Sequence, residues 1–266
     1  RFDAVADSDE KADYDQFLQR SLDPWLADYA LFRVLKNMHG ERPWPEWEAA
    51  YAQREPGALQ RIRDRYAEEI ERLCIIQFLF DRQWRMLRQR ARESRVRLFG
   101  DMPIYIALDS SDAWSHREML LVDDNGQPSH VAGVPPDYFS EDGQLWGNPL
   151  YDWDYHAGSN YEWWIRRMEH AAQMCDLVRI DHFRGFESYW SVPAGEATAR
   201  KGRGEPGPGD AIFEAMQSAL GQLSIVAEDL GVITEEVDAL RLRHSMPGMT
   251  VLQFEVDDAD FDLAGI

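Results

Sequence analysis

The chain has 266 residues, of which 44% are hydrophobic and 29% charged, the balance of an ordinary globular protein. At roughly 150 residues per domain, this length predicts one large domain or two small ones. The 48 acidic and 28 basic residues give a formal charge of −20, which disfavours binding to nucleic acids and to anionic membranes. The longest nearly apolar run, residues 73–80, is too short to cross a bilayer.

The two cysteines and the chain ends give expectations about compartment and completeness. Cys74 and Cys175 have no paired spacing, which argues against a disulfide scaffold or a zinc ribbon and favours a reducing, cytoplasmic location. The first residues do not resemble a signal peptide, so none is expected here. The sequence begins with Arg1 and stops at Ile266 without a helix cap or polar tail, so we expect an internal fragment of a longer protein.

The first third of the chain has a helical pattern. Pro43, Pro45, Pro56 and Gly57 divide its early part into at least two helices. Beyond them, apolar side chains recur at steps of three and four, as on one face of a single long helix: Leu59, Ile62, Tyr66, Leu73, Phe80, Trp84 and Leu87. We therefore predict a mainly helical subdomain over residues 1–95.

From residue 96 onward, predicted strands alternate with helices. Strands are expected at 97–107, 177–183, 224–231 and 249–255, and helices at 161–175, 210–220 (with Asp210 as N-cap) and 235–243. Residues 109–160 are expected to form a long irregular insertion, and 191–209 a Gly/Pro loop. The alternation favours βαβ units in a parallel sheet. The predicted fold class is α/β: a partial (β/α)8 barrel over residues 96–266, with a helical N-terminal subdomain and a loop-rich insertion.

Two of the predicted strands end in acids. Arg179 and Asp181 alternate with apolar residues and so share one strand face, and Glu228 lies near the end of the next strand. Two carboxylates at the carboxyl ends of neighbouring strands can serve glycoside chemistry, one attacking the anomeric carbon and the other protonating the departing oxygen. Arg179 would keep Asp181 ionised. The alternative is that both acids are strand-end caps or ion-pair partners.

The insertion gives a second indication of sugar chemistry. Residues 134–151 mix aromatic rings with short polar side chains, a composition that suits a groove in which sugar rings rest on aromatic faces. The alternative is a loop that its own aromatic side chains hold against the body of the protein.

Four segments resemble the amylomaltase family, bacterial 4-α-glucanotransferases (disproportionating enzymes) related to the α-amylases. They are GDMPIYIALDSSDAW (100–114), GVPPDYFSEDGQLWGNPLYDW (133–153), VRIDHFRGF (178–186) and AEDLG (227–231). The resemblance implies a (β/α)8 barrel with inserted subdomains. It also implies retaining transfer of an α-1,4-glucan segment from one maltooligosaccharide to another through a covalent glycosyl-enzyme, with no metal or organic cofactor.

The resemblance also implies roles for individual residues. By motif, Asp181 would be the nucleophile and Glu228 the general acid/base, while Arg179 and His182 would flank the sugar at the bond that is cut. A loop arching over the glucan would carry four further contacts: Tyr138, Phe139, Gln144 and Trp146. Asp101, expected at the end of the first predicted strand, would shape the pocket without a catalytic role.

One departure from the family limits what this chain is expected to do. Members of the family carry a third essential carboxylate in a His-Asp-Asn segment, which this sequence does not contain. We therefore expect glucan transfer from the parent protein and little or none from this chain alone. The expected partners are maltooligosaccharides and α-1,4-glucans, and the oligomeric state is not predicted. An α-glucan hydrolase and a noncatalytic glucan-binding module are the alternatives.

Overall fold

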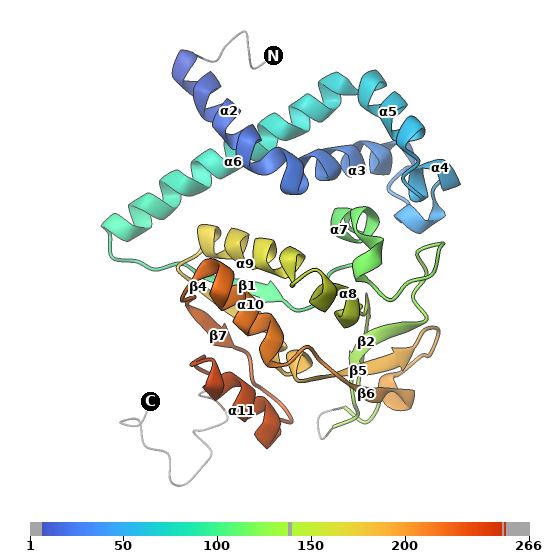
Figure 1. The fold of residues 1–266 in the computed structure, drawn as a ribbon, viewed down its shortest axis with the longest axis vertical. Coiled ribbons are helices and arrows are strands. Elements are labelled where there is room, and N and C mark those ends of the chain that lie inside the picture. Colours follow the sequence, from blue (N-terminus) through green and yellow to red (C-terminus); the bar gives the residue numbers. More distant parts are fainter. Residues whose placement is uncertain (1–6, 138–139, 252, 254–266) are drawn as a thin grey trace.

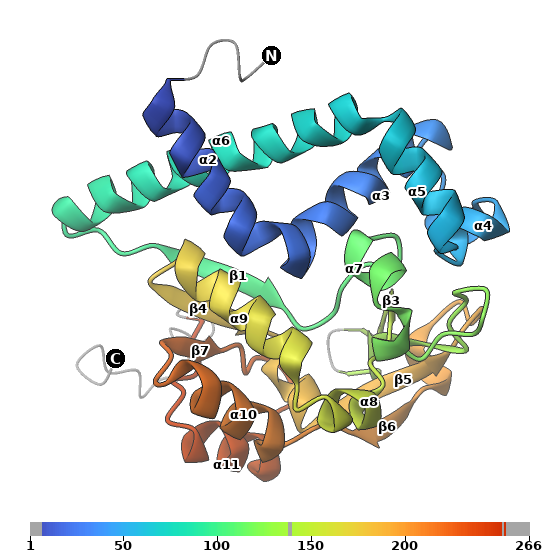
Figure 2. The same cartoon turned by 45° about the horizontal axis from the view of Figure 1, so that its top comes forward.

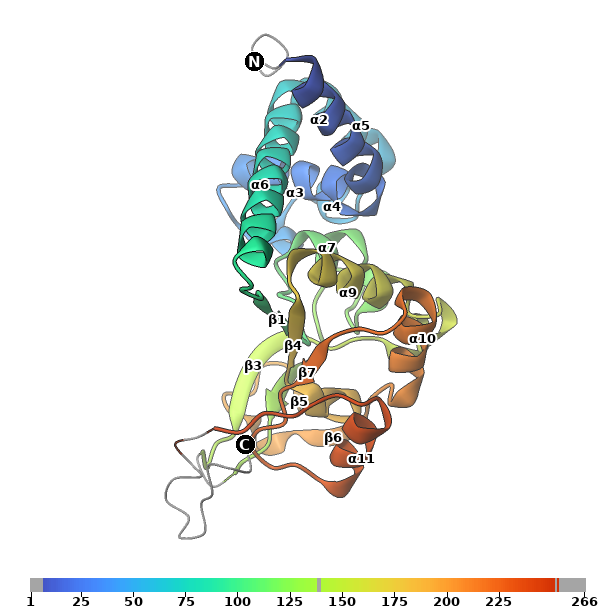
Figure 3. The same ribbon diagram turned by 90° about the vertical axis from the view of Figure 1, so that its left-hand side faces the viewer.

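The computed structural model describes residues 7–137, 140–251 and 253. Helices make up most of the described chain before residue 94, and two β-sheets with further helices follow (Figure 1). Figure 3 shows the helical segment at one end of the molecule and the sheets at the other. The predicted α/β class is confirmed in this coarse form. No helix among the described residues has both the length and the apolar character needed to span a membrane.

The helical segment contains more separate helices than its apolar pattern predicts. The predicted single helix through residues 59–87 is wrong, because it breaks at Tyr66, whose backbone angles (φ −113°, ψ 28°) are not helical. The apolar period of 3.6 continues across the break, so the sequence pattern hides the change of direction. The elements are α2 (Ser8–Ser21), η1 (Leu22–Leu26), α3 (Ala27–Met38), η2 (Trp44–Glu46), α4 (Ala49–Ala52), α5 (Pro56–Arg65) and α6 (Ala67–Glu93).

Buried aromatic side chains join the helical segment to the rest of the chain. Trp114, on α7 (Ser111–Ser115), is fully buried among residues of α3 and α5, and its indole N–H donates to the Tyr51 carbonyl at 3.0 Å. In the other direction, the indole N–H of Trp44 donates to the Leu108 carbonyl at 2.6 Å. The Lys36 ammonium and the Asp109 carboxylate form an ion pair beside them at 2.7 Å.

A three-stranded parallel sheet forms the centre of the second part. Its strands are β1 (Phe99–Pro103), β4 (Leu177–Asp181) and β7 (Ile225–Ala227), in the order β1-β4-β7. The helices α9 (Glu162–Met174), α10 (Asp210–Leu220) and α11 (Glu235–Arg243) lie on one side of it (Figure 3). Val178 and Ile180 of β4 pack into the core with Trp164 and Phe213. The strand predicted at 249–255 is wrong for residues 249–251, which are not a strand, while residues 252, 254 and 255 lie outside the described residues.

A second, antiparallel sheet of four strands was not anticipated by the sequence analysis. Its order is β3 (Gln144–Pro149), β2 (His130–Val134), β5 (Ser188–Pro193) and β6 (Arg203–Pro206) (Figure 2, right). The predicted Gly/Pro loop at 191–209 is therefore wrong, and the insertion is less irregular than expected. The pairing of β2 with β5 joins segments far apart in sequence, which local composition does not reveal. Pro206 is tolerated because β6 is an edge strand.

Short helical elements connect these strands: η3 (Arg117–Met119), α8 (Trp153–Gly158), η4 (Phe183–Phe186) and η5 (Ala199–Lys201).

The N-cap of helix α10 is one residue earlier than predicted. Its N-cap is Gly209, whose backbone (φ 58°, ψ −136°) suits glycine, and Asp210 is the first helical residue. Asp210 pairs with Arg243 and His244 at the end of α11.

Candidate active site

The carboxyl end of the parallel sheet gathers most of the predicted site residues. Along β4, Val178 and Ile180 are buried while Arg179 and Asp181 on the other face are partly exposed, as the alternation predicts. Asp101 on β1 lies level with Arg179 in the register of the sheet. It stands in the middle of its strand and not at its end. Ligands of parallel α/β sheets bind at this end because loops and strand termini converge there.

Arg179 binds two carboxylates. Its Nε and one terminal nitrogen donate to the two oxygens of Asp101 at 2.9 and 2.8 Å, and the same terminal nitrogen lies 3.0 Å from an oxygen of Asp181. The hydrogen bonds to Asp101 raise the pKa of Arg179 above its ordinary value, and attraction to both carboxylates and to Glu228 adds to this, while partial burial opposes it. Asp181 thus has a permanent cation beside it, as predicted for Arg179.

Glu228 directly follows β7 and is attached to the end of β4. Its two carboxylate oxygens accept the backbone N–H groups of His182 (2.9 Å) and Leu230 (3.0 Å). Its own N–H donates to the Ile180 carbonyl at 2.9 Å, and its carbonyl accepts from the N–H of Phe183 at 3.2 Å. Because His182 is the residue after Asp181, the structure brings the two predicted catalytic acids to the same rim of the sheet.

His182 has an unusual backbone and a neutral ring. Its φ of 58° and ψ of 50° lie in the left-handed region, which directs its N–H toward Glu228. Burial, and to a smaller extent the nearby Arg184 guanidinium, lower the pKa of its imidazole to about 4. Gly185 packs against it: a Cβ at that position would lie 3.1 Å from the ring of His182 and 2.8 Å from Ile104.

Trp146 brings the insertion to this rim. Its ring meets the His182 ring edge to face, with centroids 4.7 Å apart and an interplanar angle of 82°. Its indole N–H donates to the side-chain oxygen of Gln144, also on β3, at 3.1 Å. Of the four residues assigned to the arching loop, Gln144 and Trp146 are therefore in contact with each other. Tyr138 and Phe139 lie outside the described residues.

Tyr105 is a further aromatic residue of this site, to which the sequence motifs assign no role. Its ring contacts Trp146 edge to face at 6.2 Å and stacks on Tyr151 at 6.0 Å. It therefore supports the tryptophan from the side of β1. A signal was present, because Tyr105 follows Asp101 closely in the GDMPIYIA segment. Only the structure shows that the Tyr105 ring, just after β1, contacts Trp146 of the insertion.

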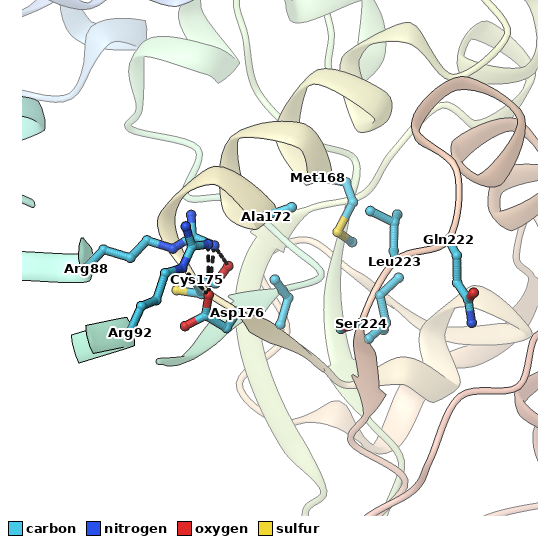
Figure 4. A pocket seen from close by; sticks show the side chains of 11 residues that line it. Arg88, Arg92, Met168, Ala172, Cys175, Asp176, Gln222, Leu223 and Ser224 are labelled. Carbon is cyan, nitrogen blue, oxygen red and sulfur yellow. Dashed lines mark hydrogen bonds and ion pairs between the residues drawn. The ribbon is translucent and has the colours of Figure 1, made fainter. Parts of the chain in front are cut away.

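A cavity of about 250 Å³ lies elsewhere, at the amino ends of β4 and β7 (Figure 4). Arg88 and Arg92 of α6 line it, and both pair with Asp176 at 3.1 Å. Asp176 also accepts the N–H of Leu98 at 2.9 Å. These bonds attach α6 to the start of β4. The cavity therefore lies where the helical segment joins the sheet, at the end remote from the acids.

The described residues contain no group of three or more His, Cys, Asp or Glu that could hold a metal ion.

Comparison with known proteins gives consistent matches over nearly the whole chain. The sequence profile of the 4-alpha-glucanotransferase family matches residues 1–264. The 4-alpha-glucanotransferase of Thermus thermophilus is 48% identical over 257 residues, which cover 97% of this chain and 51% of the relative. The enzyme of the same name from Synechocystis sp. is 49% identical over 247 residues, covering 92% of this chain and 49% of the relative.

The fold also matches a solved structure. The amylomaltase from Streptococcus agalactiae, solved in complex with acarbose, superposes with a TM-score of 0.90 at 38% identity. The match covers 98% of this chain and 52% of that one. The chain thus spans about half the length of the relatives that it matches.

Proposed function

The chain belongs to the 4-alpha-glucanotransferase family, and on that premise we propose that its protein transfers α-1,4-glucan segments between maltooligosaccharides with retention of configuration. One observation of the site carries this proposal: Arg179 pairs with both Asp101 and Asp181, next to the backbone amide that holds Glu228. The parallel order β1-β4-β7, with helices on one side, supports a partial (β/α)8 barrel over residues 96–266. Residues 1–95 would form the helical subdomain.

The chemistry follows from two carboxylates with different roles. Asp181 attacks the anomeric carbon, forming a carbon–oxygen bond to the enzyme as the glycosidic bond breaks, while Glu228 gives a proton to the departing sugar oxygen. In the second step Glu228 takes the proton of the acceptor 4-hydroxyl. That oxygen then attacks the anomeric carbon and releases Asp181. Each step inverts the configuration, so two steps retain it.

The contacts of the site support this division of roles. The Arg179 guanidinium lies 3.0 Å from a carboxylate oxygen of Asp181 and so orients the group that we propose as nucleophile. Glu228 has both oxygens occupied by backbone N–H groups. A proton on either oxygen competes with one of these donors, so we expect the side chain to shift when it works as an acid.

Aromatic rings above this rim supply a place for sugar to bind. Trp146 is 37% exposed, and the contacts of its ring with the rings of His182 and Tyr105 hold it in one orientation. Gln144 beside it offers hydrogen bonds to hydroxyl groups. We assign Tyr138 and Phe139 to the same glucan contact from the family motif alone. A relative of this fold was solved with acarbose, so acarbose is the probe that we choose for this site.

The sequence has no His-Asp-Asn segment, so we propose that the 266-residue chain alone turns over glucans poorly. A cytoplasmic location is consistent with Cys74 and Cys175, which are both free thiols.

The test is chromatography of maltotriose after incubation with the protein and with its Asp181→Asn variant. It is run on the 266-residue chain and on a longer protein that contains it. Glucose together with maltooligosaccharides longer than the substrate, absent in the variant, is the expected result for the longer form. Shorter products alone would identify a hydrolase. Binding of acarbose without any products from either form would identify a glucan-binding module.

A further inference from the structure

Asp229, the residue after Glu228, is bound by a different part of the fold. Its side chain is 11% exposed and pairs with Arg241 of α11, with the carboxylate oxygen 3.0 Å from Nε. Its other oxygen accepts the N–H of Met249 at 2.7 Å. Arg241 also donates to the Met246 carbonyl at 3.1 Å. One carboxylate therefore joins the end of β7, helix α11 and the segment 246–249.

The segment 246–249 fits closely around this carboxylate. At Gly248, a Cβ would lie 2.1 Å from Oδ2 of Asp229, so only glycine allows the chain to pass this near. The preceding residue, Pro247, accepts the N–H of Ala227 at 2.9 Å. The residues on both sides of Glu228 are thus bonded to the same short segment.

Glu228 itself is bonded in the opposite direction, to β4. Its N–H donates to Ile180, its carbonyl accepts from Phe183, and its carboxylate accepts from His182. Its backbone is therefore held from both sides, by β4 on one and by the segment 246–249 on the other.

We propose that Asp229 is a positioning residue for the transfer reaction, which holds the backbone of Glu228 in place through Arg241, Met249 and the close approach of Gly248. This inference rests on the proposed function of Glu228 as the acid/base. Asp229 does not touch the reacting atoms. It keeps the backbone of Glu228 fixed while the Glu228 side chain gives and takes a proton. This matters because catalysis is sensitive to displacements of about 1 Å.

The first test is amide hydrogen exchange of the folded 266-residue chain with Asp229→Asn. We expect the Glu228 and His182 amides to exchange faster by about tenfold or more, because the local opening of the β7 end becomes easier. The matched control is Asp210→Asn, which removes an ion pair of the same helix α11 on its solvent side. Equal exchange at Glu228 in both variants would overturn the proposal.

A second variant keeps the test decisive if Asp229→Asn does not fold. Gly248→Ala leaves every charge in place and disturbs only the approach to Asp229. It should accelerate exchange at Glu228 and leave amides of α9 unchanged. A uniform rise across the chain would indicate a merely structural role and would contradict the proposal.

Kinetics with maltotriose separate positioning from sugar binding. They are measured on whichever form, the 266-residue chain or a longer protein containing it, disproportionates the trisaccharide. Asp229→Asn should lower kcat by about tenfold to a hundredfold while KM stays within about twofold, since the lost interaction affects the reacting group. If no form of the wild type turns over maltotriose, the proposed function fails, whereas the exchange result still decides whether Asp229 holds Glu228.

Discussion

Asp101 and Arg179 stand level with each other on neighbouring parallel strands and share two hydrogen bonds, of 2.9 and 2.8 Å. The terminal nitrogen that makes the shorter bond also lies 3.0 Å from Asp181. A planar guanidinium can serve two carboxylates at once in this way, whereas an ammonium group is a single point charge. Asp181, the proposed nucleophile, is therefore held by a residue that Asp101 orients.

Arg179→Lys should lower transfer activity by about a hundredfold, because the lysine keeps the charge but cannot hold both carboxylates in position. The stability should change little, since the side chains of Arg179, Asp101 and Asp181 are 24, 56 and 43% exposed. Product chromatography from maltotriose and thermal melts measure the two effects. Arg200→Lys is the matched control, because Arg200 also pairs with two acids, Glu141 and Asp142, at an exposed position. Equal activity losses in both variants would contradict the assignment.

Trp146→Ala should weaken the binding of acarbose by about tenfold, since a sugar face loses its aromatic platform. Trp146→Phe should recover part of the affinity. Calorimetric titration of the 266-residue chain provides the measurement. Leu145→Ala is a close control, because Leu145 is adjacent on β3 and equally exposed at 37%. A Leu145 effect as large as that of Trp146 would indicate general damage to the strand.

His156 should make the protein less stable in acid. Its ring is fully buried against Tyr151 and Trp153, and burial lowers its pKa to about 4. Between that value and the unfolded pKa of about 6.5, the unfolded chain binds a proton that the folded chain does not, so the free energy of unfolding falls as the pH falls. The loss from pH 7.5 to 5 should be about 2 kcal/mol for this group.

Urea unfolding of the wild type and of His156→Phe at these two pH values tests the linkage. The phenylalanine keeps a ring among the aromatic neighbours but does not titrate. Its stability should therefore depend less steeply on pH. His182 retains its own contribution with the same sign, because its pKa is also lowered to about 4. An unchanged slope in His156→Phe would show that His156 does not contribute.

Asp176→Asn should destabilise the protein by about 1–3 kcal/mol, because Arg88 would lose its charged partner at a site where both side chains are nearly buried, 13 and 14% exposed. The N–H of Leu98 and the two arginines hold the pKa of Asp176 at about 2, so this stabilisation is present at neutral pH and is lost as the pH falls from about 4 to about 2. Urea unfolding at pH 7 measures it. Glu93→Gln, which removes the exposed pair with Arg90, should change stability by less than about 0.5 kcal/mol.

The local pattern was sufficient for much of the candidate site. The alternation in VRID places Arg179 and Asp181 on one face of β4, and the structure has them in contact. Asp101 was expected at a strand end, but it lies in the middle of β1, level with Arg179 of β4. The position of a residue along a sheet depends on which strands pair and in which register. The support of Trp146 by Tyr105 could not be predicted, because Tyr105 follows β1 of the parallel sheet and Trp146 lies on β3 of the other sheet.

The sequence by itself determined the α/β class, the helices and strands at most of the periodic segments, and the residue types that surround the acids. These depend on neighbours within a few positions, where side-chain period and turn residues act directly. The tertiary structure alone decided the antiparallel sheet that unites the insertion with β5 and β6, the break at Tyr66, and the opposite attachments of Glu228 and Asp229. Each of these depends on contacts between segments far apart in the chain, whose free energy no local pattern contains.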